Sequence, residues 1–282
     1  MQNSADRGVL YLATGDKYIQ EAIHSARSVK ETNPDLSITI LTDTSIQTET
    51  DCFDNVIRNE DLDHQYGLLQ PDMFPYDRTL FLDTDTYVCE NISDLFNLLN
   101  DFDLAVTHSP GRPELDDRHD HFLDGEIPDS FPLYNSGVIA YADNKRVREV
   151  FTRWNQLYEQ YSHFEGMEWN QPSFRAALYM SDVDIVTLHK EYNCRFPYPN
   201  GVTGDVKILH GRVGGEMEYV EKVASELNST DTYRVHTLKK WPIYVTEGKK
   251  SLRYEINQSI RDVGLFRTLA KGPRYLYRKL SQ

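Results

Sequence analysis

The stretch TLFLDTDTYV, Thr79 to Val88, ends a mostly apolar run in two aspartates that are separated by one threonine. Its first four residues are typical of a buried strand. Two neighbouring carboxylates repel each other, and burying either one is costly unless a cation compensates. Asp83 and Asp85 therefore predict a cation site at the end of a strand.

Short apolar strands and amphipathic helices alternate around this stretch. GVLYLA at residues 8–13 predicts a strand, residues 18–31 carry apolar or small side chains at a helical spacing, and LSITILT at residues 36–42 predicts a second strand. A strand, a helix and a strand within about forty residues form a right-handed crossover, which predicts parallel pairing.

The same pattern continues along the chain and predicts the fold class. Further strands are predicted at residues 56–57, 80–82, 104–107, 138–141, 183–188 and 206–209, and further helices at residues 92–99, 145–161 and 170–179. This order predicts an α/β protein. Ligands of open α/β sheets bind beyond the carboxyl ends of strands, which is where Asp83 and Asp85 are expected. Residues 109–132 show no period and predict a long loop, interpreted as an active-site lid.

Composition limits the class of partner. The formal net charge is −14, which argues against nucleic-acid binding because a phosphate backbone would be repelled. The chain shows no secretory apolar segment and no membrane-spanning run, and its three cysteines lack a paired spacing. We expect a cytoplasmic protein.

Residues 249–282 differ from the rest of the chain because Lys and Arg outnumber Asp and Glu there and alternate with aromatic and aliphatic residues. This predicts a domain at 1–248 followed by a basic, aromatic helical appendage. A solvated helix is the ordinary interpretation of such a charge run. On an acidic protein, however, it favours peripheral contact with an anionic membrane at its inner face.

His210, in KILHGR, follows another predicted strand. Two carboxylates favour a hard divalent cation such as Mn²⁺ or Mg²⁺, and an imidazole beside them favours Mn²⁺. Neither a D-x-D segment nor a single histidine is specific alone, since both are common without a function.

Five motifs in a fixed order make the pattern specific: LATGDKY at residues 12–18, YDRTLFLDTDTYV at 76–88, YNSGVI at 134–139, NQPSF at 170–174 and ILHG at 208–211. The series resembles the GT-A-fold glycosyltransferases, and most closely the retaining family that includes glycogenin and bacterial lipopolysaccharide galactosyltransferases (family 8). The resemblance extends over residues 8–245. It implies a mixed sheet flanked by helices, a UDP-sugar donor, a glycan, lipid-linked or protein acceptor, and retention of configuration; the residues themselves do not separate UDP from GDP.

The resemblance also implies residue roles. The metal ligands would be Asp83, Asp85 and His210. The nucleotide and donor sugar would contact Leu12, Thr14, Gly15, Tyr18, Arg78, Thr84, Asn135, Ser136 and Arg212. The catalytic residues would be Gln171, Arg78 and Asn170.

Two positions depart from the family pattern. Asn170 stands where the family usually has an aspartate, which bears on the recognition of sugar hydroxyls. The family's lysine in a His-x-x-Gly-x-x-Lys-Pro-Trp element has no clean match in HGRVGGEMEY, so Arg212 is the candidate replacement for binding the diphosphate.

Two other classes of function remain as alternatives. Haloacid-dehalogenase phosphatases use a strand-ending D-x-D as nucleophile and acid, although Tyr87 stands here where they usually have Thr or Val. A non-catalytic nucleotide-sugar-binding protein is favoured only if the change at Asn170 disables the chemistry. Nucleotidyltransferases are disfavoured because LATGDKY lacks their Gly-rich loop.

Overall fold

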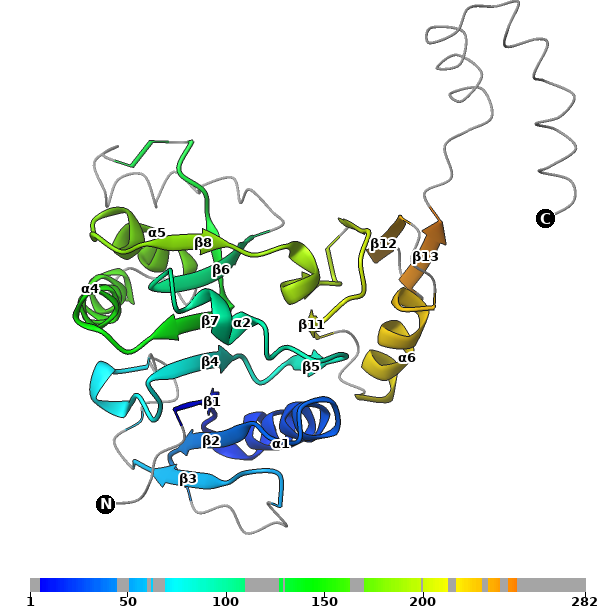
Figure 1. Cartoon of the computed structure of the whole chain (residues 1–282), viewed down its shortest axis with the longest axis horizontal. Helices are drawn as coiled ribbons and strands as arrows, with labels where there is room; N and C mark the ends of the chain where they lie inside the picture. Colours follow the sequence, from blue (N-terminus) through cyan, green and yellow to red (C-terminus); the bar gives the residue numbers. More distant parts are fainter. Residues whose placement is uncertain are drawn as a thin grey trace, which may run out of the picture.

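The computed structural model describes residues 6–44, 51–59, 62, 69–109, 127–128, 130–162, 170–198, 200–212, 217–229, 233–238 and 243–247. Its centre is a seven-stranded sheet with the order β3-β2-β1-β4-β7-β6-β8 (Figure 1). The strands are β1 (Arg7–Leu12), β2 (Ser37–Thr42), β3 (Asn55–Arg58), β4 (Arg78–Leu82), β6 (Leu104–His108), β7 (Tyr134–Ala142) and β8 (Ile185–Thr187).

Six of these strands run in one direction, and β7 runs against both of its neighbours. The β1-β2 pair is parallel, as the crossover pattern predicts. The sheet as a whole is mixed, so the predicted α/β class is confirmed. The carboxyl ends of β1, β4, β6 and β8 consequently share one edge of the sheet.

Helices cover both faces because the strands alternate two sets of apolar side chains. Val9 and Tyr11 belong to a core with α1 (Gly15–Thr32) and α2 (Leu95–Leu98). The opposite face, which includes Leu10, packs against α4 (Lys145–Ser162) and α5 (Gln171–Tyr179). The two cores hold β4 rigidly, and with it the start of the D-T-D segment.

Two three-stranded sheets extend the fold on the side of the carboxyl edge (Figure 1). One contains β5 (Thr86–Val88), β9 (Cys194–Arg195) and β11 (Ile208–His210), and the other contains β10 (Asn200–Val202), β12 (Arg234–Leu238) and β13 (Ile243–Glu247). The remaining elements are the short helices η1 (Pro71–Met73) and η2 (Lys190–Asn193) and the helix α6 (Met217–Leu227). Because β11 pairs with β5, which follows the D-T-D segment, the fold places His210 opposite Thr86.

Some element bounds differ from those predicted. β7 begins at Tyr134, four residues before the predicted strand, because its polar Asn135 and Ser136 are buried and hydrogen-bonded instead of lying in a loop. The predicted helix at 92–99 contracts to the single turn of α2, preceded by a turn.

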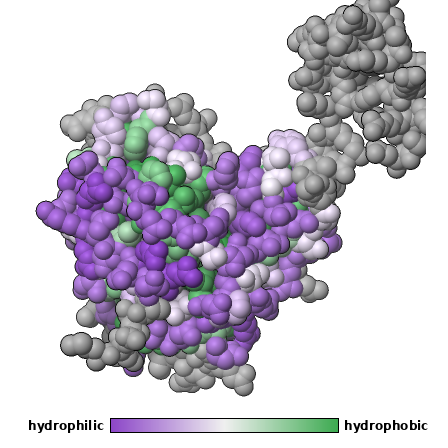
Figure 2. Space-filling model, viewed as in Figure 1, coloured by the Kyte–Doolittle hydropathy of each residue, from purple (hydrophilic) through white to green (hydrophobic). Residues whose placement is uncertain are grey.

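The predicted lid falls largely outside the described residues, and the appendage at 249–282 falls wholly outside them. Among the helices within the described ranges, none is long and apolar enough to cross a membrane. The described surface that Figure 2 shows is mostly hydrophilic, with smaller hydrophobic areas toward its middle.

Candidate active site

The backbone positions Asp83 and Asp85 where β4 gives way to β5. The N–H of Asp83 donates to the carbonyl of Gly137 on β7 at 2.8 Å. The carbonyl of Asp85 accepts from the N–H of Gly211 at 2.9 Å, directly after β11. Each aspartate is thus tied to a different segment that approaches the site.

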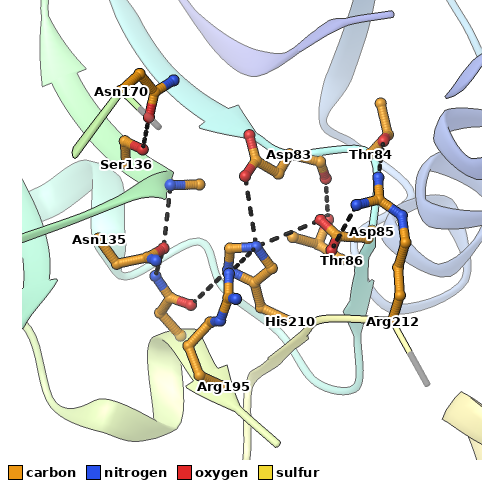
Figure 3. A network of polar contacts seen from close by, with 12 residues as sticks. Asp83, Thr84, Asp85, Thr86, Asn135, Ser136, Asn170, Arg195, His210 and Arg212 are labelled. Atoms are coloured by element: carbon orange, nitrogen blue, oxygen red, sulfur yellow. Dashed lines mark hydrogen bonds and ion pairs between the residues drawn. The ribbon is translucent and has the colours of Figure 1, made fainter. Parts of the chain in front are cut away.

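The side chains of Asp83, Asp85 and His210 converge (Figure 3). His210 Nε2 lies 3.4 Å from Asp83 Oδ2 and 3.3 Å from Asp85 Oδ1. One ligand atom from each of the three residues lies within 4.8 Å of the others. The His210 side chain is 1% exposed, and those of Asp85 and Asp83 are 11% and 44% exposed, so the cluster opens to solvent on the side of Asp83.

The charges of this cluster shift its titrations. Burial opposes the charged form of Asp85, but attraction to His210, Arg212 and Arg195 lowers the pKa of Asp85 well below its usual range. Burial also lowers the pKa of His210, but the carboxylates of Asp85 and Asp83 outweigh it and raise that pKa above the usual value. The pocket therefore favours a positive charge next to the two carboxylates.

Residues that the sequence analysis did not single out contact both ring nitrogens of His210. Asn193 Oδ1 lies 2.8 Å from His210 Nδ1, and Arg195 Nη1 lies 2.9 Å from His210 Nε2. Asn193 Nδ2 donates to Oδ1 of Asn135 at 2.8 Å. Asn135 is thus connected to the histidine through Asn193.

Arg212 lies on the other side of Asp85. Its Nε and Nη2 donate to the two carboxylate oxygens of Glu21 at 2.8 and 2.7 Å, and its Nη1 lies 3.4 Å from Asp85 Oδ2. Thr84 Oγ1 donates to the same Glu21 carboxylate at 2.9 Å. The Arg212 guanidinium also lies 5.3 Å from the ring centre of Tyr18, whose side chain is exposed. The pKa of Arg212 is raised, chiefly by the hydrogen bond to Glu21, so this cation is permanent.

Ser136 and Asn170 meet on the opposite side of the cluster. Ser136 Oγ donates to Asn170 Oδ1 at 2.9 Å, and the carbonyl of Asn170 accepts from Trp154 Nε1 at 3.2 Å. The side-chain oxygen of Asn170 therefore accepts a hydrogen bond from Ser136 beside the cluster. A cavity of about 90 Å³ opens here, and its lining includes Leu12, Asp83, Ser136 and Asn170.

Gln171 is the first residue of α5 and is 8% exposed. Its side-chain oxygen is buried and has no hydrogen-bond partner among the residues that the structure describes. A buried acceptor without a donor is costly, and such atoms in folded proteins call for an explanation. A ligand hydroxyl would satisfy this one.

The LATGDKY segment forms the turn from β1 into α1. Thr14 is buried at 6% exposure, and Gly15 follows with φ of 73°, a conformation that favours glycine. The N–H of Gly15 donates to Asp43 Oδ1 at 3.1 Å. The first two turns of α1 thus begin at the carboxyl edge and place Tyr18 and Glu21 beside Arg212.

Arg78 does not join this site. It is the first residue of β4, whereas Asp83 follows the last one, and five residues of strand separate them by about 16 Å. Its guanidinium pairs with Asp6 at 2.6 Å and donates to Asn100 at 3.2 Å. Arg78 begins β4 and Asp83 follows its carboxyl end, so the two residues lie at opposite edges of the sheet. The structure therefore gives no support to a role for Arg78 in donor binding or catalysis.

The residues present suit a divalent cation. Two carboxylates and an imidazole supply hard oxygen ligands and one nitrogen ligand. Gly137 keeps the space open, since a Cβ at this position would lie 2.2 Å from His210 Cε1 and 2.3 Å from Asp83 Oδ2. A larger cavity, of about 720 Å³, lies beside β8 and η2 but is lined by none of the predicted site residues. The cluster of possible metal ligands, and not the size of the cavity, identifies the candidate site.

Comparison with known proteins supports the fold. No protein-family model matches the chain, and no curated protein matches it in sequence. Among solved structures, the galactosyltransferase LgtC in complex with donor and acceptor sugar analogues superimposes with a TM-score of 0.52 and 16% identity, covering 79% of this chain and 97% of LgtC. The glycosyltransferase GlyE of Streptococcus pneumoniae TIGR4 matches with a TM-score of 0.50 and 20% identity, covering 74% of this chain and 55% of GlyE. The chain thus has the GT-A fold of these glycosyltransferases, and the predicted resemblance is confirmed at the level of the fold.

Proposed function

We propose that this protein is a metal-dependent glycosyltransferase that moves a sugar from a nucleotide-diphosphate sugar, a UDP-sugar, to a glycan, lipid-linked or protein acceptor with retention of configuration. One observation carries the proposal: Asp83, Asp85 and His210 converge at the carboxyl edge of a GT-A sheet. A divalent ion held by these three residues, Mn²⁺ or Mg²⁺, would supply a Lewis acid and neutralise the departing diphosphate.

The surrounding residues have complementary roles in this proposal. Arg212 provides a second positive charge for the diphosphate from the side of Glu21, and its planar guanidinium suits phosphate oxygens. Ser136, Asn170 and Gln171 lie on the sugar side, where the unpaired oxygen of Gln171 accepts a hydrogen bond from a sugar hydroxyl. An active-site glutamine is also the residue replaced in one LgtC mutant structure, which supports this assignment.

The reaction needs stabilisation of the leaving group more than a strong base. In a front-face displacement the sugar–phosphate bond breaks, the acceptor oxygen bonds to the same face of the sugar, and the departing phosphate oxygen takes the acceptor's proton. The positive charges around Asp85 stabilise the departing phosphate, and the low dielectric constant of a buried site strengthens each of these interactions.

The phosphatase alternative fits the geometry less well. It needs one aspartate free to attack a phosphorus atom and the other to donate a proton. Here burial raises the pKa of Asp85, but attraction to His210 outweighs burial and lowers that pKa overall. Asp85 therefore stays charged, which suits a metal ligand better than a proton donor. A non-catalytic binder would use the same pocket, and turnover separates it from an enzyme.

A panel of nucleotide sugars incubated with Mn²⁺ tests the proposal by measuring nucleotide release. We expect one donor, a UDP-sugar, to be hydrolysed slowly without acceptor, and this release to stop when a chelator is added. Release of inorganic phosphate from phosphate esters would instead indicate the phosphatase, and tight donor binding with no release would indicate a binding protein.

Replacing Arg212 with alanine should raise the KM for the donor with a smaller effect on kcat. Hydrogen bonds between charged groups contribute about 1.5–3 kcal/mol, so we expect an increase of about ten- to a hundred-fold. Steady-state kinetics with varied donor measure this. Arg78→Ala is the matched control, since it also removes an ion-paired arginine but at the other edge of the sheet, and should leave the KM unchanged. Equal KM values for both variants would assign Arg212 a purely structural pairing with Glu21.

The membrane proposal concerns residues 249–282 and rests on their sequence alone. We expect deletion of these residues to reduce binding to vesicles that contain anionic lipid, while nucleotide release from a soluble donor is retained. Cosedimentation with anionic and with neutral vesicles is the measurement. If the shortened and full chains cosediment equally, the tail has no such role.

A further inference from the structure

The hydrogen-bond chain behind His210 fixes which ring nitrogen faces the two aspartates. The chain runs from the backbone N–H of Gly137 through the side chains of Asn135 and Asn193 to His210 Nδ1 (Figure 3). Asn135, Asn193 and His210 are 1%, 3% and 1% exposed, so water contributes little to their polar contacts. The orientation of each side-chain amide, and the tautomer of His210, follow from which atoms can donate a hydrogen bond.

The starting point is a group whose role is fixed. A backbone N–H can only donate, and that of Gly137 lies 3.1 Å from a terminal atom of Asn135, which must therefore be the oxygen. The same oxygen lies 2.8 Å from one terminal atom of Asn193, which must be the NH₂ group because two oxygens would repel. The other terminal atom of Asn193 is then the oxygen, 2.8 Å from His210 Nδ1. His210 Nδ1 must carry the hydrogen.

A contact at the other ring nitrogen leads independently to the same tautomer. Arg195 Nη1 lies 2.9 Å from His210 Nε2, and a guanidinium has donors but no acceptor. In this contact Nε2 provides the lone pair. If His210 takes up a second proton, that proton is on Nε2, which lies 3.4 Å from Asp83 Oδ2 and 3.3 Å from Asp85 Oδ1. Nε2 then no longer accepts from Arg195, but Nδ1 carries a hydrogen in both charge states.

We propose that Asn193, held by Asn135, is the positioning residue that keeps His210 as the Nδ1–H tautomer and directs the Nε2 lone pair at Asp83 and Asp85 for metal binding. This deepens the proposed function and rests on it for the metal. Histidine ligands generally donate their second ring N–H to a fixed acceptor, and loss of that acceptor typically lowers metal affinity ten- to a hundred-fold. A metal ion bound at Nε2 would replace the contact that Arg195 makes with this nitrogen.

The proposal assigns Asn135 a different task from direct sugar contact through its oxygen. That oxygen already accepts from Gly137 and from Asn193, which uses both of its lone pairs. Any contact of Asn135 with the donor must therefore use its NH₂ group. Its oxygen acts on the metal site through Asn193.

The first experiment reads the tautomer in the metal-free full-length protein. Long-range ¹H–¹⁵N NMR of ¹⁵N-histidine-labelled protein, at a pH where the imidazole is neutral, distinguishes the protonated ring nitrogen from the bare one. Comparison with His210→Gln assigns the signal among the nine histidines. We expect hydrogen on Nδ1, and hydrogen on Nε2 in the wild-type protein would overturn the proposal.

Two substitutions at Asn193 then separate tautomer from stability. Asn193→Leu removes the acceptor at similar volume, and should mix the tautomers and weaken Mn²⁺ binding in the presence of UDP about ten- to a hundred-fold. Asn193→Asp keeps an acceptor for Nδ1–H but loses the donor to Asn135, so we expect a lower Tm, an unchanged tautomer and Mn²⁺ affinity within about three-fold of wild type. The titration uses the paramagnetic resonance of free Mn²⁺.

The control is Asn144→Leu, which removes a half-buried asparagine that contacts Asp103 and the start of α4, away from the site. It should lower the Tm without changing the His210 signal. If Asn193→Leu behaves like this control, Asn193 is structural only and the proposal fails. If Asn193→Leu does not fold, the wild-type tautomer and Asn193→Asp still decide. Absence of Mn²⁺ binding by the wild type would refute the proposed function and leave the tautomer result standing.

Discussion

Replacing Asp85 with asparagine is expected to lower metal-dependent nucleotide release by about a thousand-fold, because a metal clamp supplies several kcal/mol of transition-state stabilisation. Asp85 is the more buried of the two aspartates and lies between His210, Arg195 and Arg212, whose attraction outweighs burial and lowers its pKa. The amide keeps the shape of the side chain but removes the charge. We expect Mn²⁺ affinity, measured by titration calorimetry with UDP present, to fall in parallel.

The same substitution leaves the cations around Asp85 without their counter-ion. A loss of stability must therefore be separated from a loss of metal binding. Asp103→Asn is a matched control, since Asp103 is also buried and accepts from Arg146 at the amino end of β6, away from the site. This control should lower the Tm while keeping Mn²⁺ affinity. Turnover by Asp85→Asn at the wild-type rate, or wild-type turnover that resists a chelator, would contradict the metal assignment.

The three proposed metal ligands were accessible to sequence reasoning because each lies just beyond a run predicted as a strand. The apolar run before Asp83 and the run before His210 both end at polar residues. If both runs belonged to one parallel sheet, such ends would collect at one edge, so the pattern alone predicts proximity. The structure brings the three side chains together through the β5-β11 pair, which no local pattern predicts, since each of these strands has only three residues.

Glu21, Asn193 and Arg195 escaped the sequence analysis for related reasons. Arg195 is placed beside His210 by β9, a strand of two residues that is too short to show alternation. Asn193 ends a single turn of 3₁₀ helix within KEYN, which has no distinguishing pattern. Glu21 had a usable signal, because it lies one turn after Tyr18 on a helix that begins at the carboxyl edge of the sheet.

Arg78 is a predicted site residue that the structure places away from the other predicted ligands. The family pattern asks for a basic residue before the D-x-D strand, and Arg78 satisfies that description in sequence. Sequence order along a strand is also distance in space, so the residue that begins β4 lies at the edge away from the ligands that follow it. A resemblance carried over by motif order alone does not include this geometric condition.

Replacing Gly137 with alanine is expected to disrupt the metal site by adding a single carbon atom. The new Cβ would lie 2.2 Å from His210 Cε1 and 2.3 Å from Asp83 Oδ2, well inside contact distance. His210 is buried and bonded to Asn193, so it has little room to move, whereas Asp83 is 44% exposed and can rotate outward. We expect Mn²⁺ affinity to fall by at least about a hundred-fold and overpacking to cost about 1–3 kcal/mol of folding free energy.

Mn²⁺ titration and thermal unfolding of the same samples distinguish these two effects. Gly204→Ala is the matched control, because a Cβ there would have Glu191 Cγ as its nearest neighbour, at an ordinary 4.0 Å. That variant should match the wild type in both measurements. Should Gly137→Ala bind Mn²⁺ as tightly as Gly204→Ala, the ion would have to sit elsewhere, because Asp83 and His210 cannot both keep their positions against an alanine at 137.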